Sequence, residues 1–163
     1  MTHQLNFIYN DSDWVAPAEY PDLSQATEIA IDLETKDPNI KTKGPGWATF
    51  DGHIVGFAVA ALGQQWYFPI AHDAGGNMDL SITCAWMQDI LKTDATKIFH
   101  NASYDVGWLL VNGFEIRGKI VDTMIAAALI NENRFSFSLN ACAKDYLGEI
   151  KNETFLNEKA KEW

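Results

Sequence analysis

The 163-residue chain contains only two cysteines, Cys84 and Cys142, and they lack the spacing of a metal or redox site. The sequence has no CxxC motif, and no histidine stands at zinc-ligand spacing from either thiol. Scarce, unpatterned cysteines are typical of proteins in a reducing compartment. We therefore expect an intracellular protein with free, unreactive thiols.

Positive charge is also scarce, because 12 Lys and Arg stand against 22 Asp and Glu, for a net charge of -10. This balance argues against a broad basic surface for duplex nucleic acid. It does not exclude a protein whose acidic side chains hold metal ions, since the metals then supply the positive charge. We expect weak binding to nucleic acid without metal or without further domains.

Long apolar runs, internal repeats and phosphate-binding loops are absent as well. No run reaches the length of a membrane span, and residues 1–10 do not have the pattern of a signal peptide, so no membrane association is expected. The Gly- and Pro-rich stretch 36–52 has neither Walker nor dinucleotide-binding spacing and is predicted to be a loop. The length and the 47% hydrophobic content suit one globular domain.

Hydrophobic periodicity predicts an α/β protein. Residues 1–28 form an N-terminal leader that contributes an edge strand near residues 5–9, and the main domain covers residues 29–163. Strands are predicted at 28–35, 53–62, 66–70, 97–99 and 119–121, and helices at 80–92, between the caps Asn101 or Ser103 and the stop Gly113, and at 123–130, 138–147 and 153–163. A three-strand meander followed by αβαβ is the ribonuclease H-like arrangement, with a central mixed five-stranded sheet and flanking helices.

Two acids stand near the end of the first predicted strand. Because strand side chains alternate between faces, Asp32 and Glu34 point the same way. Neighbouring carboxylates repel unless a cation or a proton lies between them, and Mg²⁺ or Mn²⁺ is the usual cation for such oxygen ligands. A strand that runs out into a solvated acidic turn is the alternative interpretation.

A third acid, Asp105, falls in the first turns of the helix that follows the fourth strand, on the same stripe as Trp108 and Leu109. A carboxylate on an apolar face needs a partner or a metal. The alternative is that Asp105 only favours the helix N-terminus electrostatically. Asp122, in contrast, is interpreted as the structural cap of the helix at 123–130.

These motifs resemble those of the DEDD 3′–5′ exonucleases. Asp32-Leu33-Glu34-Thr35 resembles their first motif, and residues 100–105, His-Asn-Ala-Ser-Tyr-Asp, resemble the second. Residues 66–73, 121–124, 138–139 and 146–148 are similar to the proofreading domain of family A DNA polymerases, phage enzymes above all. The resemblance covers about residues 29–163.

One element of that family pattern is missing. The third motif, Tyr-x-x-x-Asp, occurs only at Tyr9 to Asp13, before the first motif and therefore in the wrong place. In the polymerases it lies about as far beyond the second motif as the second lies beyond the first, which falls past Trp163. We therefore expect a chain that is truncated at its C-terminus and much less active than a full domain, or inactive. A naturally degenerate domain is the alternative account.

The resemblance implies a two-metal hydrolysis of single-stranded DNA 3′ ends that releases nucleoside 5′-monophosphates. Two divalent ions, Mg²⁺ or Mn²⁺, would lie about 4 Å apart. By similarity, Asp32 bridges both ions, Glu34 binds the ion on the nucleophile side and Asp105 holds the other. Leu33, Thr35, Asn101 and Tyr104 would contact the terminal nucleotide, although packing or capping would also explain each of them.

The family also implies a cellular setting and partners. We expect a monomer in the cytoplasm of a bacterial or phage-infected cell, with a polymerase domain in cis if the natural chain continues. Three alternatives stay open: a non-catalytic ribonuclease H-like scaffold, a stand-alone DEDD exonuclease acting on RNA, and an acidic binding module in which the three acids never meet.

Overall fold

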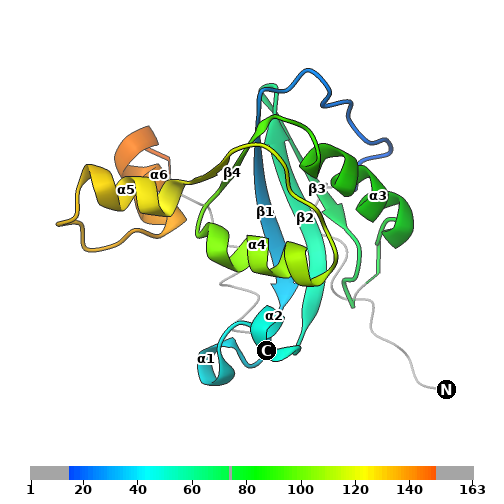
Figure 1. Ribbon diagram of the computed structural model, residues 1–163, viewed down its shortest axis with the longest axis horizontal. Helices are drawn as coiled ribbons and strands as arrows, with labels where there is room; N and C mark the ends of the chain where they lie inside the picture. The colour runs from blue at the N-terminus through cyan, green and yellow to red at the C-terminus, as the bar shows by residue number, and fades with distance from the viewer. Residues whose placement is uncertain (1–14, 74, 150–163) are drawn as a thin grey trace.

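The computed structural model describes residues 15–73 and 75–149, and it confirms the α/β fold (Figure 1). The expected edge strand near residues 5–9 and the expected helix at 153–163 lie outside the described residues. The strands are β1 (Glu28–Lys36), β2 (His53–Ala61), β3 (Gln64–Pro69), β4 (Thr96–Phe99) and β5 (Ile120–Asp122). The helices are α1 (Ile40–Lys43), α2 (Gly46–Thr49), α3 (Leu80–Leu91), α4 (Ala102–Val111), α5 (Thr123–Ile130) and α6 (Leu139–Leu147).

The five strands form one mixed sheet in the order β3-β2-β1-β4-β5, with β1 at its centre. β1, β2 and β3 pair antiparallel, as the meander predicted, and β4 and β5 pair parallel beyond β1. The hairpin between β2 and β3 turns at Leu62 and Gly63, which both have positive φ (53° and 72°). Two such residues are typical of the tight turn whose twist matches the paired strands.

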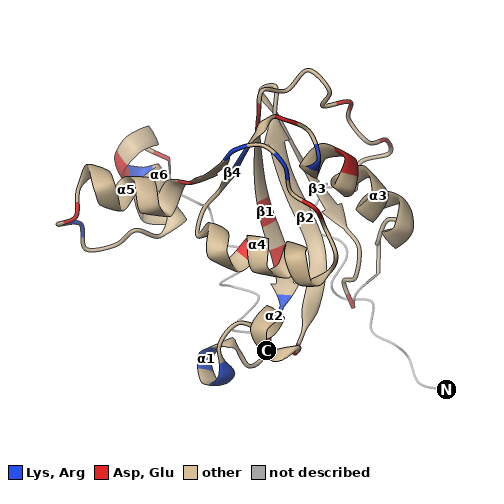
Figure 2. Ribbon diagram, in the orientation of Figure 1, with Lys and Arg blue, Asp and Glu red and all other residues tan. Residues whose placement is uncertain are grey.

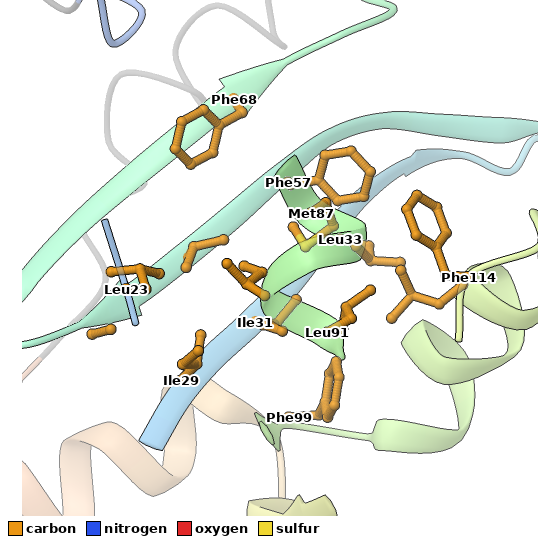
Figure 3. Packing of buried hydrophobic residues seen from close by; sticks show 14 of the residues in the cluster. Leu23, Ile29, Ile31, Leu33, Phe57, Phe68, Met87, Leu91, Phe99 and Phe114 are labelled. Carbon is orange, nitrogen blue, oxygen red and sulfur yellow. The ribbon is translucent and has the colours of Figure 1, made fainter. Parts of the chain in front are cut away.

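The core lies between the sheet and α3 (Figure 3). Ile29, Ile31 and Leu33 alternate along β1 with residues of the opposite face, and all three are buried, as strand periodicity predicts. They pack in one cluster with aromatic residues of β2 and β3 and with apolar residues of α3. The labelled members of the cluster include Phe57, Phe68, Met87, Leu91, Phe99 and Phe114.

The segment before β1 belongs to the same core. Leu23 is only 3% exposed, and the ring of Tyr20 stacks on Phe68 with centroids 5.6 Å apart. Trp86 of α3 donates a hydrogen bond from Nε1 to the carbonyl oxygen of Pro21 at 3.1 Å. These contacts hold the segment against α3 and β3.

The loop predicted over residues 36–52 is only partly a loop, because it contains the short helices α1 and α2. The prediction was wrong here because turn residues such as Gly44 and Gly46 also border single helical turns. What holds α2 in place is tertiary contact. A Cβ on Gly107 of α4 would lie 2.4 Å from a ring carbon of Trp47, so the two helices pack as closely as a glycine permits.

Gly46→Ala is expected to lower the free energy of unfolding by about 1–3 kcal/mol, the usual cost of overpacking. A Cβ at this buried position would lie 1.9 Å from the carbonyl oxygen of Asp51 and 2.8 Å from the Trp108 ring, so backbone must move. Urea unfolding measures the change. Lys41→Ala, on the exposed side of α1, is the control and should stay within about 0.5 kcal/mol of wild type. Equal stability of the two variants would contradict the packing argument.

Helices α5 and α6 lie as a pair beside the β5 edge of the sheet (Figure 1). His100, which follows β4, connects this pair to the sheet: its Nδ1 lies 2.9 Å from Thr123 Oγ1 and its Nε2 lies 2.9 Å from the Phe137 carbonyl oxygen. The pair and the segment that connects its helices leave large apolar side chains exposed, among them Leu129 of α5 and Phe135 between the helices. Within residues 15–149, as far as they are described, no helix has the length and apolar character needed to cross a membrane.

Candidate active site

Asp32 and Glu34 lie on the face of β1 that is turned away from the core, and both are exposed. Their register partners on β2 are Ala58 and Gly56, two of the smallest residues available. Because Ala58 is small, the face is open beside Asp32, and a cavity of about 960 Å³ lies there. The cavity is lined by Ala30, Asp32, Ala58, Tyr67, Ile98 and His100, among others.

Asp105 reaches the same strand from α4. Its Oδ1 accepts a hydrogen bond from the backbone N–H of Leu33 at 3.2 Å. This N–H is available because the pairing of β1 with β4 ends at Ala30, so the Asp105 carboxylate stands where a β4 carbonyl would otherwise pair. Figure 2 shows acidic residues on β1 and in α4 where the helix crosses the strand. Asp105 is thereby held at the edge of β1 between the positions of Asp32 and Glu34.

The environment of Asp105 disfavours its charge. The residue is 3% exposed, and among the described residues it forms no ion pair with Lys, Arg or His. Burial raises the pKa of Asp105 to about 7, and the negative charges of Asp32 and Asp122 add to this rise. The Leu33 N–H bond lowers the pKa but does not offset the burial. A site that keeps an acid poorly solvated beside another acid favours a cation as its third component.

Thr35 and Tyr104, both predicted to contact substrate, are brought together on the α4 side of β1. Their hydroxyl oxygens lie 2.8 Å apart, and Tyr104 donates to Asp37 Oδ2 at 3.0 Å. Asp37 Oδ2 also accepts from the Gly46 N–H at 2.8 Å. Sequence reasoning missed Asp37, because only the fold of the 36–52 segment places it against α4.

Asn101 stands at the start of α4, but it does not cap the helix with its side chain as predicted. The cap is supplied by Asp122, whose carboxylate accepts from the N–H groups of Asn101 and Ala102 as well as from those of Met124 and Ile125 in α5. Burial alone would raise the pKa of Asp122, but these four N–H groups lower it. The structural interpretation of Asp122 is confirmed, and the parallel β4–β5 pair explains how one carboxylate serves two helices.

The side chain of Asn101 makes a local contact, since its Oδ1 accepts from Ser103 Oγ at 3.1 Å. Its backbone is left-handed, with φ at 69°, a conformation that Asn tolerates better than most residues. This turn directs the chain from β4 into α4 and so sets the start of the helix that carries Asp105. The substrate-binding role predicted for Asn101 stays a prediction.

The donor set at this site is oxygen only, which is the chemistry that Mg²⁺ and Mn²⁺ prefer. Two exposed carboxylates on one strand face and one buried carboxylate at its edge fit such ions. Among the described residues, no three Asp, Glu, His or Cys side chains lie close enough together to hold a metal ion as they stand. The fit therefore rests on the kind of donors and on their shared location.

Two further residues near the acids were not assigned from the sequence. Tyr67 of β3 lines the same cavity as Asp32, and its hydroxyl lies 2.5 Å from His72 Nε2. Both residues fall in the stretch 66–73 that resembles the polymerase proofreading domain, but the pattern alone did not show which side chains turn toward the acids. The sheet register decides this.

Solved structures with this arrangement are ribonuclease H-like exonucleases, and the fold of the chain is of that class. Brucella melitensis NrnC with bound Mg²⁺ shares it with a TM-score of 0.57 at 20% identity, over 80% of this chain and 59% of that one. Escherichia coli RNase D gives 0.58 at 19% identity, over 81% and 31%. Pol1 of M. smegmatis, in complex with DNA primer-template and dNTP, gives 0.59 at 20%, over 80% and 21%.

The chain belongs to the 3′–5′ exonuclease domain family of family A DNA polymerases, whose sequence profile matches residues 18–163. A DNA-directed DNA polymerase of Pseudomonas phage M6 is 33% identical over 161 residues, 94% of this chain. The DNA polymerase DpoZ of Salmonella phage PMBT28 is 30% identical over 146 residues, 88% of this chain. The matches cover 24% and 21% of these two relatives, so the chain spans about a quarter of their length.

Proposed function

We propose that this exonuclease domain hydrolyses single-stranded DNA from the 3′ end with two divalent metal ions and releases nucleoside 5′-monophosphates. The observation that carries the proposal is the hydrogen bond from Leu33 N–H to Asp105 Oδ1, because it brings the acid of the second motif onto the strand of the first. The contact supports a shared location for the three acids, against the alternative of an acidic binding module in which they lie far apart.

The three acids divide the work between them. When bound, the divalent ions supply Lewis-acid stabilisation of the phosphate and activation of the attacking water. Asp32, on the open face, would hold both ions, Glu34 the ion on the side of the water and Asp105 the other. The Mg²⁺ present in the NrnC structure supports an oxygen-donor magnesium site in this fold.

Substrate contact would come from Leu33, Thr35, Asn101 and Tyr104. The 2.8 Å contact between the Thr35 and Tyr104 hydroxyls fixes the Tyr104 ring beside the strand that carries the acids. An aromatic ring fixed in this way can stack on a nucleobase of any sequence, which suits removal of whichever nucleotide stands at the 3′ end.

The similarity to phage DNA polymerases supports a role for this domain within a polymerase. We propose that the domain acts as a monomeric proofreading unit in cis to a polymerase domain, in the cytoplasm of the bacterial host. A net charge of -10 gives the chain little general attraction for DNA, so the bound metals and the neighbouring polymerase would supply most of the affinity.

The test is degradation of a 5′-labelled single-stranded DNA oligonucleotide with Mg²⁺ or Mn²⁺. Because the third motif with its fourth acid is missing, we expect a ladder that shortens only slowly from the 3′ end. It should stop on addition of EDTA and yield nucleoside 5′-monophosphates. An RNA oligonucleotide of the same sequence is the matched control and should be degraded more slowly. Metal-independent cleavage or a preference for RNA would contradict the proposal. No cleavage by the folded protein with either metal would point to the truncation or to a non-catalytic scaffold.

A further inference from the structure

Tyr67 occupies space that Gly56 leaves free. A Cβ built on Gly56 would lie 2.0 Å from the Tyr67 hydroxyl oxygen and 2.4 Å from the ring carbon that bears it. Gly56 is also the register partner of Glu34. Since directly paired residues of antiparallel strands project to the same face, the Tyr67 hydroxyl lies on the Glu34 side of the sheet.

A second set of paired residues also places Tyr67 on the sheet face that carries the acids. Asp32 pairs with Ala58, and Ala58 pairs in turn with Tyr67, so the three side chains share one face. From this row the Tyr67 side chain leans along the strands to Gly56, the partner of Glu34. Small residues on β2 therefore let a β3 tyrosine reach the acids on β1, two strands away.

His72 holds the Tyr67 hydroxyl from the other side. The hydroxyl lies 2.5 Å from His72 Nε2, and the two rings meet edge to face with centroids 5.8 Å apart. The loop that carries His72 is itself fixed by Asn77. The His72 backbone N–H donates to Asn77 Oδ1 at 2.7 Å, and the His72 carbonyl oxygen accepts from Asn77 Nδ2 at 2.9 Å. The Tyr67 side chain is thus held between the space at Gly56 and the hydrogen bond to His72.

The charge of Glu34 acts on this hydroxyl. Burial, and then the negative charge of Glu34, raise the pKa of Tyr67 to about 12. The phenol therefore keeps its proton at neutral pH. When His72 Nε2 carries a proton and donates it to the phenol oxygen, the phenol O–H is left to donate to a carboxylate.

We propose that Tyr67, held by His72, is a positioning residue that orients the Glu34 carboxylate for metal binding. The inference rests on the proposed function, in that Glu34 is taken as a metal ligand. Two carboxylates on one strand face repel each other, and a protonated phenol beside one of them limits the directions in which it can turn away. Groups that orient a metal ligand in this way typically change metal affinity or activity by about 10- to 100-fold when removed.

The experiment is a double-mutant cycle on Mn²⁺ affinity, measured from free Mn²⁺ by electron paramagnetic resonance. Tyr67→Phe, which removes only the hydroxyl, is expected to weaken binding by about tenfold. Tyr20→Phe is the matched control, since it removes a hydroxyl that contacts Thr83 Oγ1 at 2.7 Å within the core, and it should leave the affinity unchanged. The double variant Glu34→Gln with Tyr67→Phe should bind no more weakly than Glu34→Gln alone.

The outcomes separate the inference from the function on which it rests. Wild-type affinity in Tyr67→Phe, or losses that add in the double variant, would overturn the positioning role while leaving Glu34 as a ligand. Wild-type affinity in Glu34→Gln would instead overturn Glu34 as a ligand, and the positioning role with it. Equal losses in Tyr67→Phe and Tyr20→Phe would show a general effect on the fold and also overturn the inference.

Discussion

Asp105→Asn is expected to make the metal-free protein more stable than wild type at pH 8 and to remove its exonuclease activity. The carboxylate is 3% exposed, and burial raises its pKa to about 7. Asn keeps an oxygen that can accept from the Leu33 N–H, but it carries no charge to desolvate. The variant thus loses a proposed metal ligand and at the same time relieves a buried charge.

The sign of the pH dependence follows from the raised pKa. Between about pH 4, where Asp105 ionises in the unfolded chain, and about pH 7, the folded state keeps a proton that the unfolded state has lost. The stability of wild type therefore falls as the pH rises through this window. The advantage of Asp105→Asn should grow from near zero at pH 4 to at most about 4 kcal/mol at pH 8, since each pH unit corresponds to about 1.4 kcal/mol.

Urea unfolding with chelator at a series of pH values measures this difference. Asp122→Asn is the matched control with the opposite sign, because backbone N–H groups lower the pKa of Asp122. That variant should be less stable than wild type at pH 7, with a difference that shrinks as the pH falls below about 4. Lower stability of Asp105→Asn than of wild type at pH 8 would contradict the assigned burial of charge.

Asp32→Ala is expected to slow metal-dependent removal of 3′ nucleotides by at least about 10³-fold, or about 4 kcal/mol in transition-state free energy. Asp32 is exposed on β1, with Ala58 as its neighbour, so its removal leaves the core untouched. The loss of rate would therefore report on the proposed metal site. Initial rates on a 5′-labelled single strand with Mn²⁺ measure it.

Asp89→Ala is the control for the Asp32 variant, because Asp89 is an exposed acid on α3, away from β1. It removes the same charge and should keep the wild-type rate. The Asp32 variant should also be folded and, without metal, at least as stable as wild type, because the charge of Asp32 contributes to the raised pKa of Asp105. A ladder of wild-type intensity from Asp32→Ala would contradict the proposed role of Asp32 as a metal ligand.

Much of the fold was predictable because its signals are local. Alternation along β1 placed Ile29, Ile31 and Leu33 in the core, and the cap Asp122 marked the start of α5. Prediction failed where a contact distant in sequence decides the outcome. α2 is held by Trp47 against Gly107 of α4, and the start of α4 is capped by Asp122 from the end of β5.

The candidate site was likewise predictable in part, where local signals decide the outcome. The spacing of Asp32 and Glu34 showed that they share a face, and the position of Asp105 in its helix showed that it lies on a buried stripe, because both follow from the periodicity of one element. That Asp105 reaches the Leu33 N–H depends on the pairing of β4 with β1 ending at Ala30. No local sequence pattern predicts the residue at which two paired strands separate.

The sequence by itself determined the element order, the core face of β1, and the motifs that place the chain among the polymerase exonucleases. These are properties of neighbouring residues and of the periods of helix and strand. Only the tertiary structure decided that Asp37 holds Tyr104 and that Tyr67 crosses Gly56 to the partner position of Glu34. The physical reason is that strand register and helix packing bring together residues distant in sequence. The small size of Ala58 and Gly56 matters only because side chains of the neighbouring strands lie next to them.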